Sequence, residues 1–87
     1  MPTLFIPSPI RDLTLGKASV VVAASSVREA IESLEAQYPG VKERLCDGEK
    51  IRPNISVMVD GQVSHLKMRE KLREDSEVHF LIAISGG

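Results

Sequence analysis

The stretch SVREAIESLEAQYPG, residues 26–40, predicts a long helix together with both of its ends. Ser26 at the N-cap and Glu29 at the third helical position form a capping box, which satisfies backbone N–H groups that the first turn leaves free. Pro39 and Gly40 end the helix after about 12 residues, or roughly 18 Å. Its apolar side chains share one stripe at the helical spacing: Val27, Ala30, Ile31, Leu34 and Tyr38. A helix with one apolar stripe needs an apolar surface to cover.

Two short strands are predicted before this helix. Residues 3–6 form an apolar run that Pro7 and Pro9 close, because proline donates no hydrogen bond to a strand ladder. Residues 18–23, ASVVVA, are rich in β-branched side chains, which favour strands. Together the two strands predict a hairpin with a long connection.

The stretch directly after the helix gives weaker signals. Val41 and Leu45 lie one helical turn apart, which predicts a short helical turn at most over residues 41–46. Residues 47–53 are mostly polar and contain Gly48, so we predict a loop there.

A second hairpin and a last strand follow. Residues 54–59 alternate between apolar and other side chains, and residues 62–64 return after Asp60 and Gly61, the preferred two-residue hairpin turn. Residues 77–84 alternate strongly as well, which predicts a strand with one buried face.

A charged connection over residues 66–75 joins the second hairpin to the last strand, with Leu66, Met68 and Leu72 as expected apolar anchors. A helix and a sheet that are each apolar on one face must bury those faces on each other. We therefore predict an α+β fold, in which one main helix packs on one face of a sheet of four to five strands. Residues 1–84 would form this domain, and residues 85–87 a flexible C-terminal tail.

Composition places the chain among globular proteins and argues against several classes of partner. The 87 residues suffice for one domain, and 43% apolar with 26% charged residues is ordinary for a folded one. A net charge of −1 and a pI near 6.1 argue against nucleic acid or an anionic membrane as the main partner. We see no signal peptide and no membrane-spanning run, so we expect a cytoplasmic protein.

The chain offers few groups for catalysis or metal binding. Cys46 is the single cysteine, which excludes a disulfide within the chain. It is either a persulfide carrier, which needs a site that stabilises a thiolate, or a buried structural residue, which its neighbours Leu45 and Asp47 favour. His65 and His79 lie far apart without metal-ligand spacing, so we predict no metal site and no catalytic residue.

Three stretches resemble the MoaD and ThiS family of ubiquitin-like sulfur carriers. These are residues 34–40 together with 43–45, residues 54–61, and the last strand into Ser85-Gly86-Gly87. The resemblance covers essentially the whole chain and is closest to MoaD and CysO-like carriers. It implies the β-grasp fold, a mixed sheet with its last strand in the middle beside the first. One departure is the lack of a proline before the two glycines, where molybdopterin-type carriers commonly have one.

The resemblance also implies a carrier, not an enzyme, whose chemistry resides on Gly87. An activating enzyme of the MoeB/ThiF type would use ATP to adenylate the carboxyl group, and a sulfur donor enzyme would supply the sulfur of a thiocarboxylate. A sulfur-acceptor synthase would take that sulfur, and a metal-dependent isopeptidase is a further candidate partner. Ser85 and Gly86 extend the reach of the tail to about 11 Å, and glycine passes a narrow channel because it lacks Cβ. No cofactor is expected on the chain itself.

Leu81 and Ala83 are predicted to face away from the helix, because they alternate with residues expected to face it. Exposed apolar side chains beside a reactive tail indicate a docking surface, which Met58 would extend. The alternative is a second small cluster that loop residues close. The charged connection also carries alternating basic residues, Lys67, Arg69, Lys71 and Arg73, which belong either to a solvated loop or to a basic rim that meets an acidic patch on the activating enzyme. Lys71 and Arg73 are the candidates for the rim of this docking surface.

Two other functions fit the same features. A ubiquitin-like modifier is joined through the same glycine to lysines of target proteins, after the same adenylation. A β-grasp interaction module would carry an inert tail. Among sulfur carriers the final acceptor stays open between molybdopterin, cysteine, a thiolated tRNA base and a secondary metabolite.

Overall fold

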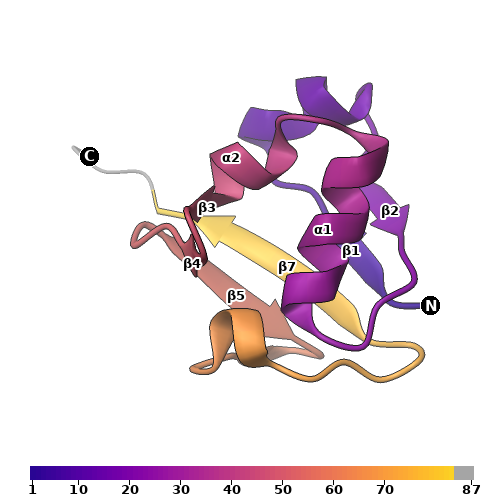
Figure 1. Ribbon diagram of the computed structural model, residues 1–87, viewed down its shortest axis with the longest axis vertical. Helices are drawn as coiled ribbons and strands as arrows, with labels where there is room; N and C mark the ends of the chain where they lie inside the picture. The colour runs from indigo at the N-terminus through magenta and orange to yellow at the C-terminus, as the bar shows by residue number, and fades with distance from the viewer. Residues whose placement is uncertain (84–87) are drawn as a thin grey trace.

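A mixed sheet lies behind one long helix in the computed structural model, which describes residues 1–83 (Figure 1). The elements follow one another as β1 (Thr3–Phe5), η1 (Ser8–Thr14), β2 (Ser19–Val21), α1 (Val27–Gln37), α2 (Val41–Leu45), β3 (Cys46–Asp47), β4 (Lys50–Ile51), β5 (Ile55–Val59), β6 (Gln62–Val63), η2 (Lys67–Arg69) and β7 (Glu77–Ile82). The predicted tail, residues 85–87, lies outside the described residues.

The strands of the main sheet lie in the order β2-β1-β7-β5-β6. The last strand, β7, therefore occupies the middle of the sheet, parallel to β1 and antiparallel to β5. Leu4 is the register partner of Val78, and Val57 is the partner of Phe80. This topology confirms the predicted α+β, β-grasp architecture.

Helix α1 begins and ends where the sequence predicts. The Glu29 backbone N–H donates to the Ser26 side-chain oxygen at 3.2 Å. The Glu29 carboxylate accepts from the backbone N–H and the hydroxyl of Ser25, at 3.0 and 2.9 Å, so the capping interaction reaches one residue further back than in a simple capping box. At the other end Gly40 has a φ of 104°, a left-handed conformation that few residues other than glycine adopt.

The core lies between α1 and the sheet face that it covers (Figure 1). Val27, Ala30, Ile31 and Leu34 of the helix are fully buried, while Tyr38 is only partly so. The sheet contributes the buried side chains Leu4, Val20, Ile55, Val57, Val78 and Phe80. Each fully buried aliphatic side chain of this kind contributes roughly 1.5–3 kcal/mol, so this interface dominates the stability of the fold.

The prediction of a loop over residues 47–53 was wrong. Cys46 pairs with Ile51 and Asp47 with Lys50, which makes β3 and β4 a small antiparallel hairpin. Cys46 and Ile51 are both buried, with 3% and 5% exposure, so two apolar side chains anchor a segment that is otherwise polar.

Two further segments differ from the sequence-based prediction. The long connection after β1 contains the 3-10 helix η1, which buries Ile10 and Thr14. Leu66 was expected to anchor the charged connection, but it is 49% exposed, whereas Met68 and Leu72 are buried as predicted. Within residues 1–83 we find no helix with the length and apolar character that crossing a bilayer requires.

Candidate functional site

Strand β7, the central strand of the sheet, leads to the C-terminal end of the described chain. It is hydrogen-bonded on both sides, to β1 and to β5, and the ladder continues to Ala83, whose backbone N–H donates to the carbonyl of Asn54 at 2.8 Å. Ser85, Gly86 and Gly87, the predicted tail, lie outside the described residues. The described chain therefore ends beside the paired residue Asn54, at one end of the sheet.

The face of the sheet opposite α1 carries apolar side chains near the C-terminal end of β7. Leu81 is 47% exposed, Ala83 is exposed, and Met58 is half-buried. Buried Val78 and Phe80 alternate with them, which confirms that Leu81 and Ala83 face outward, as predicted. Their proposed role in docking stays a prediction.

Sequence reasoning missed part of this outer face. Phe5 and His79 are register partners on β1 and β7, and their rings stack with centroids 4.2 Å apart. The row continues through Met58 to Val63, which is 56% exposed. Strand alternation places His79 on the same side as Leu81, but the partnership with Phe5 depends on the parallel register between the two ends of the chain.

Lys71 and Arg73 lie away from Leu81. Arg73 forms an ion pair with Asp60 at 3.6 Å, and the Asp60 backbone N–H donates to the carbonyl of Glu77, where β7 begins. The backbone of Lys71 pairs with that of Ser26 in an isolated antiparallel β-bridge, next to the start of α1. The structure therefore places both basic side chains toward the start of β7, and it does not bring them to the end where the tail leaves. Their docking role stays a prediction.

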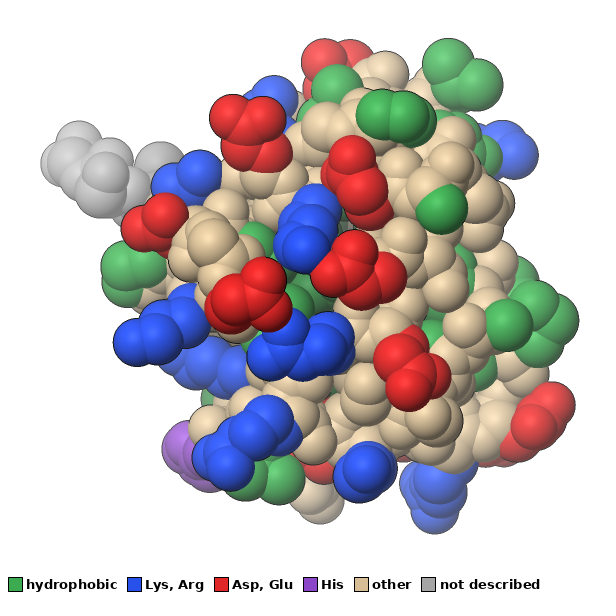
Figure 2. Space-filling model, in the orientation of Figure 1, with side chains coloured by type: hydrophobic (Ala, Val, Ile, Leu, Met, Phe, Trp, Pro, Cys, Tyr) green, Lys and Arg blue, Asp and Glu red, His purple; other side chains and the backbone are tan. Residues whose placement is uncertain are grey.

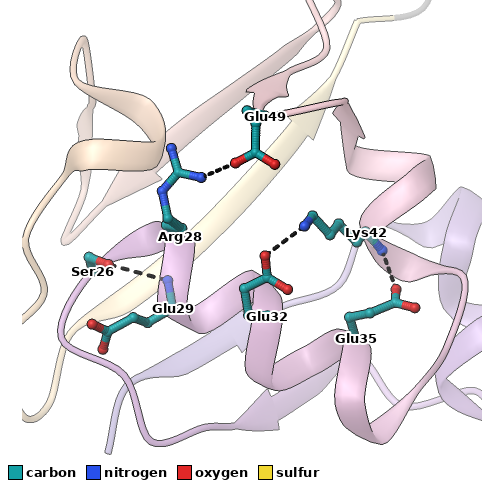
Figure 3. A network of polar contacts seen from close by, with 7 residues as sticks. All are labelled: Ser26, Arg28, Glu29, Glu32, Glu35, Lys42 and Glu49. Carbon is teal, nitrogen blue, oxygen red and sulfur yellow. Dashed lines mark hydrogen bonds and ion pairs between the residues drawn. The ribbon is translucent and has the colours of Figure 1, made fainter.

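A network of polar contacts joins α1 to α2 and to the β3–β4 hairpin (Figure 3). Arg28 pairs with Glu49 at the hairpin tip at 2.5 Å, and Glu32 pairs with Lys42 at 2.6 Å. The hydrogen bond to Glu32 raises the pKa of Lys42. Glu35 accepts from the backbone N–H of Lys42 at 2.9 Å, at the start of α2. Exposed pairs of this kind contribute at most about 1 kcal/mol each, so their main consequence is the position of the hairpin.

Cys46 is unsuited to carry a persulfide. It is 3% exposed, and burial raises the pKa of its thiol above the usual value. A nucleophilic cysteine needs the opposite environment, one that stabilises the thiolate. His65 and His79 belong to no group of three potential metal ligands among residues 1–83.

Comparison with known proteins settles which family has this arrangement. The model of the ThiS family matches residues 5–87, nearly the whole chain. The chain belongs to the ThiS family. This confirms the resemblance to the MoaD and ThiS sulfur carriers, and with it the β-grasp fold.

Individual relatives agree with the family. The sulfur carrier protein CysO of Mycobacterium tuberculosis is 28% identical to this ThiS-family chain over 90 residues, covering 98% of this chain and 97% of CysO. A chain of the BexX/CysO complex of Amycolatopsis orientalis superposes with a TM-score of 0.94 at 28% identity, with full coverage of both chains. The small archaeal modifier protein SAMP1 of Haloferax volcanii superposes with a TM-score of 0.81 at 19% identity, covering 99% of this chain and 98% of SAMP1, which shows the shared fold alone.

Proposed function

We propose that this protein is a sulfur carrier whose Gly87 is adenylated at its carboxyl group and then converted to a thiocarboxylate. Membership of the ThiS family supports the carrier role, and so do the curated relatives that are named sulfur carriers. The observation that carries the proposal is the central position of β7. A strand paired on both sides leads directly into the segment that ends in Gly86 and Gly87.

The proposed chemistry needs little from the carrier itself. A free C-terminal carboxyl group has an ordinary pKa near 3.3–3.7, so it is ionised at neutral pH. Its oxygen attacks the α-phosphorus of ATP, and pyrophosphate leaves with the electron pair of the broken phosphoanhydride bond. Hydrosulfide supplied by the donor enzyme then attacks the acyl carbon, AMP leaves with the electron pair of the broken C–O bond, and loss of the S–H proton gives the thiocarboxylate. ATP is a substrate of the MoeB/ThiF-like activating enzyme, which also has to supply the acid–base groups.

Recognition of the activating enzyme would use the outer sheet face beside the tail. A few tail residues bury too little surface for a specific complex, since stable interfaces bury roughly 800 Å² on each partner. Leu81, Ala83 and Met58 would form the apolar centre of that interface. In a solved structure from Amycolatopsis orientalis, a related chain of the same fold is in complex with BexX.

Deletion of Gly87 tests the proposal. The truncated protein should fail to support ATP–pyrophosphate exchange by a MoeB/ThiF-like activating enzyme. Its free energy of unfolding should change by less than about 0.5 kcal/mol, as for other changes outside a core. A Ser85→Ala variant serves as the matched control, because it alters the same segment and leaves the terminal carboxyl group in place. Normal exchange by the truncated protein would refute the proposal.

A further inference from the structure

A cleft of about 430 Å³ lies between the β3–β4 hairpin and the η2 segment. Its floor is apolar, since it consists of Ile51 and Met68, each 5% exposed. Leu66, which is 49% exposed, stands at the same cleft. The basic lining residues are Arg28, Lys50, Lys67 and Arg69. We call this feature the basic cleft.

The charge of the basic cleft is not balanced by its own surroundings. Glu49 is the one carboxylate among the described residues that line it, and it already pairs with Arg28. Among residues 1–83, Lys50, Lys67 and Arg69 form no ion pair within 4.0 Å. This concentration of positive charge occurs in a chain whose net charge is −1. Figure 2 shows several basic side chains on the side of the hairpin and the η2 segment, with acidic side chains among them over the hairpin.

The wall of the cleft is held in place by buried hydrogen bonds. Ser64 is 6% exposed, and its hydroxyl oxygen accepts from the Lys67 backbone N–H at 3.0 Å while donating to Glu70. The carbonyl of Glu70 accepts from the Val27 backbone N–H at 2.9 Å, which ties the segment to α1. Lys67 has a φ of 51°, a left-handed conformation that costs about 1 kcal/mol or more for a residue with a Cβ. The fold therefore maintains this loop shape against a local backbone cost.

One wall of the basic cleft, the β3–β4 hairpin, lies at the end of the sheet where β7 ends. Ile51 in its floor is close in the chain to Asn54, whose carbonyl accepts from Ala83 at the end of β7. In Figure 1 the β3–β4 hairpin lies beside the C-terminal end of β7. A protein that receives the tail would thus have this cleft within reach.

We propose that the basic cleft binds an acidic segment of a protein partner, with an apolar side chain of that segment on Ile51 and Met68. Because the hairpin that forms one wall of the cleft lies beside the C-terminal end of β7, the partner would be one that handles Gly87, and in this respect the proposal rests on the proposed function. Three unpaired cations attract carboxylates, and the apolar floor requires a side chain that a small anion does not have. A long acidic segment supplies both in one chain.

Titration of the full-length, isotope-labelled protein with a blocked peptide, Asp-Glu-Leu-Glu-Asp, tests this assignment by NMR. Backbone amide shifts should concentrate at Lys50 and at residues 66–69. Binding should weaken about tenfold or more in Arg69→Glu, because a like charge then faces the peptide. It should also weaken strongly between 0.15 M and 1 M salt, where the screening length falls from about 8 Å to about 3 Å. The peptide Lys-Lys-Leu-Lys-Lys should cause no such shifts.

Lys17→Glu is the matched control, since it makes the same charge change at an exposed residue on the turn before β2. Binding should stay within about twofold of the unmodified protein. Lys50→Glu provides a second cleft variant if Arg69→Glu loses the native amide dispersion. Absence of shifts at millimolar peptide, equal weakening by Lys17→Glu, or identical shifts with inorganic phosphate would each overturn the proposal. The titration uses neither ATP nor the Gly87 carboxyl group, so its outcome is independent of whether the protein is adenylated.

Discussion

The two faces of the β-grasp sheet differ in what they contact and therefore in what they determine. The face under α1 contributes Leu4, Val57 and Val78, all with 0% exposure, to a core that excludes water. The opposite face presents Leu81 at 47% and Val63 at 56% exposure. The covered face accounts for the fold and its stability, while the open face is available for a partner. Substitutions on the two faces should accordingly separate effects on folding from effects on binding.

The largest effect on stability is expected from Leu34→Ala. Leu34 is fully buried at the centre of the helix–sheet interface, so truncation should reduce the free energy of unfolding by roughly 2–5 kcal/mol. Urea denaturation measures this difference. Leu81→Ala makes the same chemical change on the open face, and it should cost less than about 1 kcal/mol. Equal losses in the two variants would show that the faces do not differ as described.

Leu81→Asp should weaken binding and leave the stability of the fold unchanged. A carboxylate placed at the centre of an apolar interface should weaken binding to the activating enzyme about tenfold or more, which is about 1.4 kcal/mol. Circular dichroism and the melting temperature should stay near those of the unmodified protein. Val21→Asp places the same charge on an exposed residue of β2, away from the end of β7, and should leave binding unchanged. Unfolding of Leu81→Asp would contradict the exposed position of Leu81.

Ser26→Ala tests how far the covered face depends on the start of α1. Loss of the side-chain acceptor for the Glu29 N–H should destabilise the protein by about 1 kcal/mol, less than the loss of a core side chain. Ser26→Asp retains an acceptor and should lie close to the unmodified protein. Thermal denaturation of both variants measures this difference. If Ser26→Ala melts at the same temperature as the unmodified protein, the cap contributes nothing to stability.

The smallest effect concerns pH at the turn between β5 and β6. The backbone N–H of Glu77, with help from the Ser76 hydroxyl and Arg73, lowers the pKa of Asp60. A lowered pKa contributes stability at neutral pH that is lost as pH falls below about 4 and the carboxylate becomes protonated. Asp60→Asn should therefore show a weaker fall in urea midpoint between about pH 6 and pH 3. The same fall in both proteins would exclude this contribution.

Local sequence signals predicted the elements that carry enough residues to show a pattern. The stripe and caps of α1, the Asp60-Gly61 turn and the alternation along β7 are all of this kind, and each is confirmed. The turn has positive φ at both residues, 52° and 84°, as such hairpins require. The orientation of Leu81 followed from the alternation of β7 in the same way.

Very short strands, and features that combine distant segments, could not be predicted. Strands β3 and β4 have two residues each, too few to show alternation, although Cys46 and Ile51 are both buried when the strands pair. The positions of Lys71 and Arg73 depend on the path of a connection without regular structure. The alternating basic residues of the charged connection indicated a basic surface, but the sequence did not show that Arg28 and Lys50 would join Lys67 and Arg69 at one cleft.

The intact mass of the protein purified from its own host tests the central claim most directly. If Gly87 carries a thiocarboxylate, part of the protein should show the mass gain that corresponds to sulfur in place of one oxygen, located by fragmentation to the C-terminal residue. The gain should be absent from the Gly87 deletion variant. A mass that stays at the value of the unmodified chain, even after incubation with the activating enzyme, ATP and a sulfur donor, would contradict the assignment as a sulfur carrier.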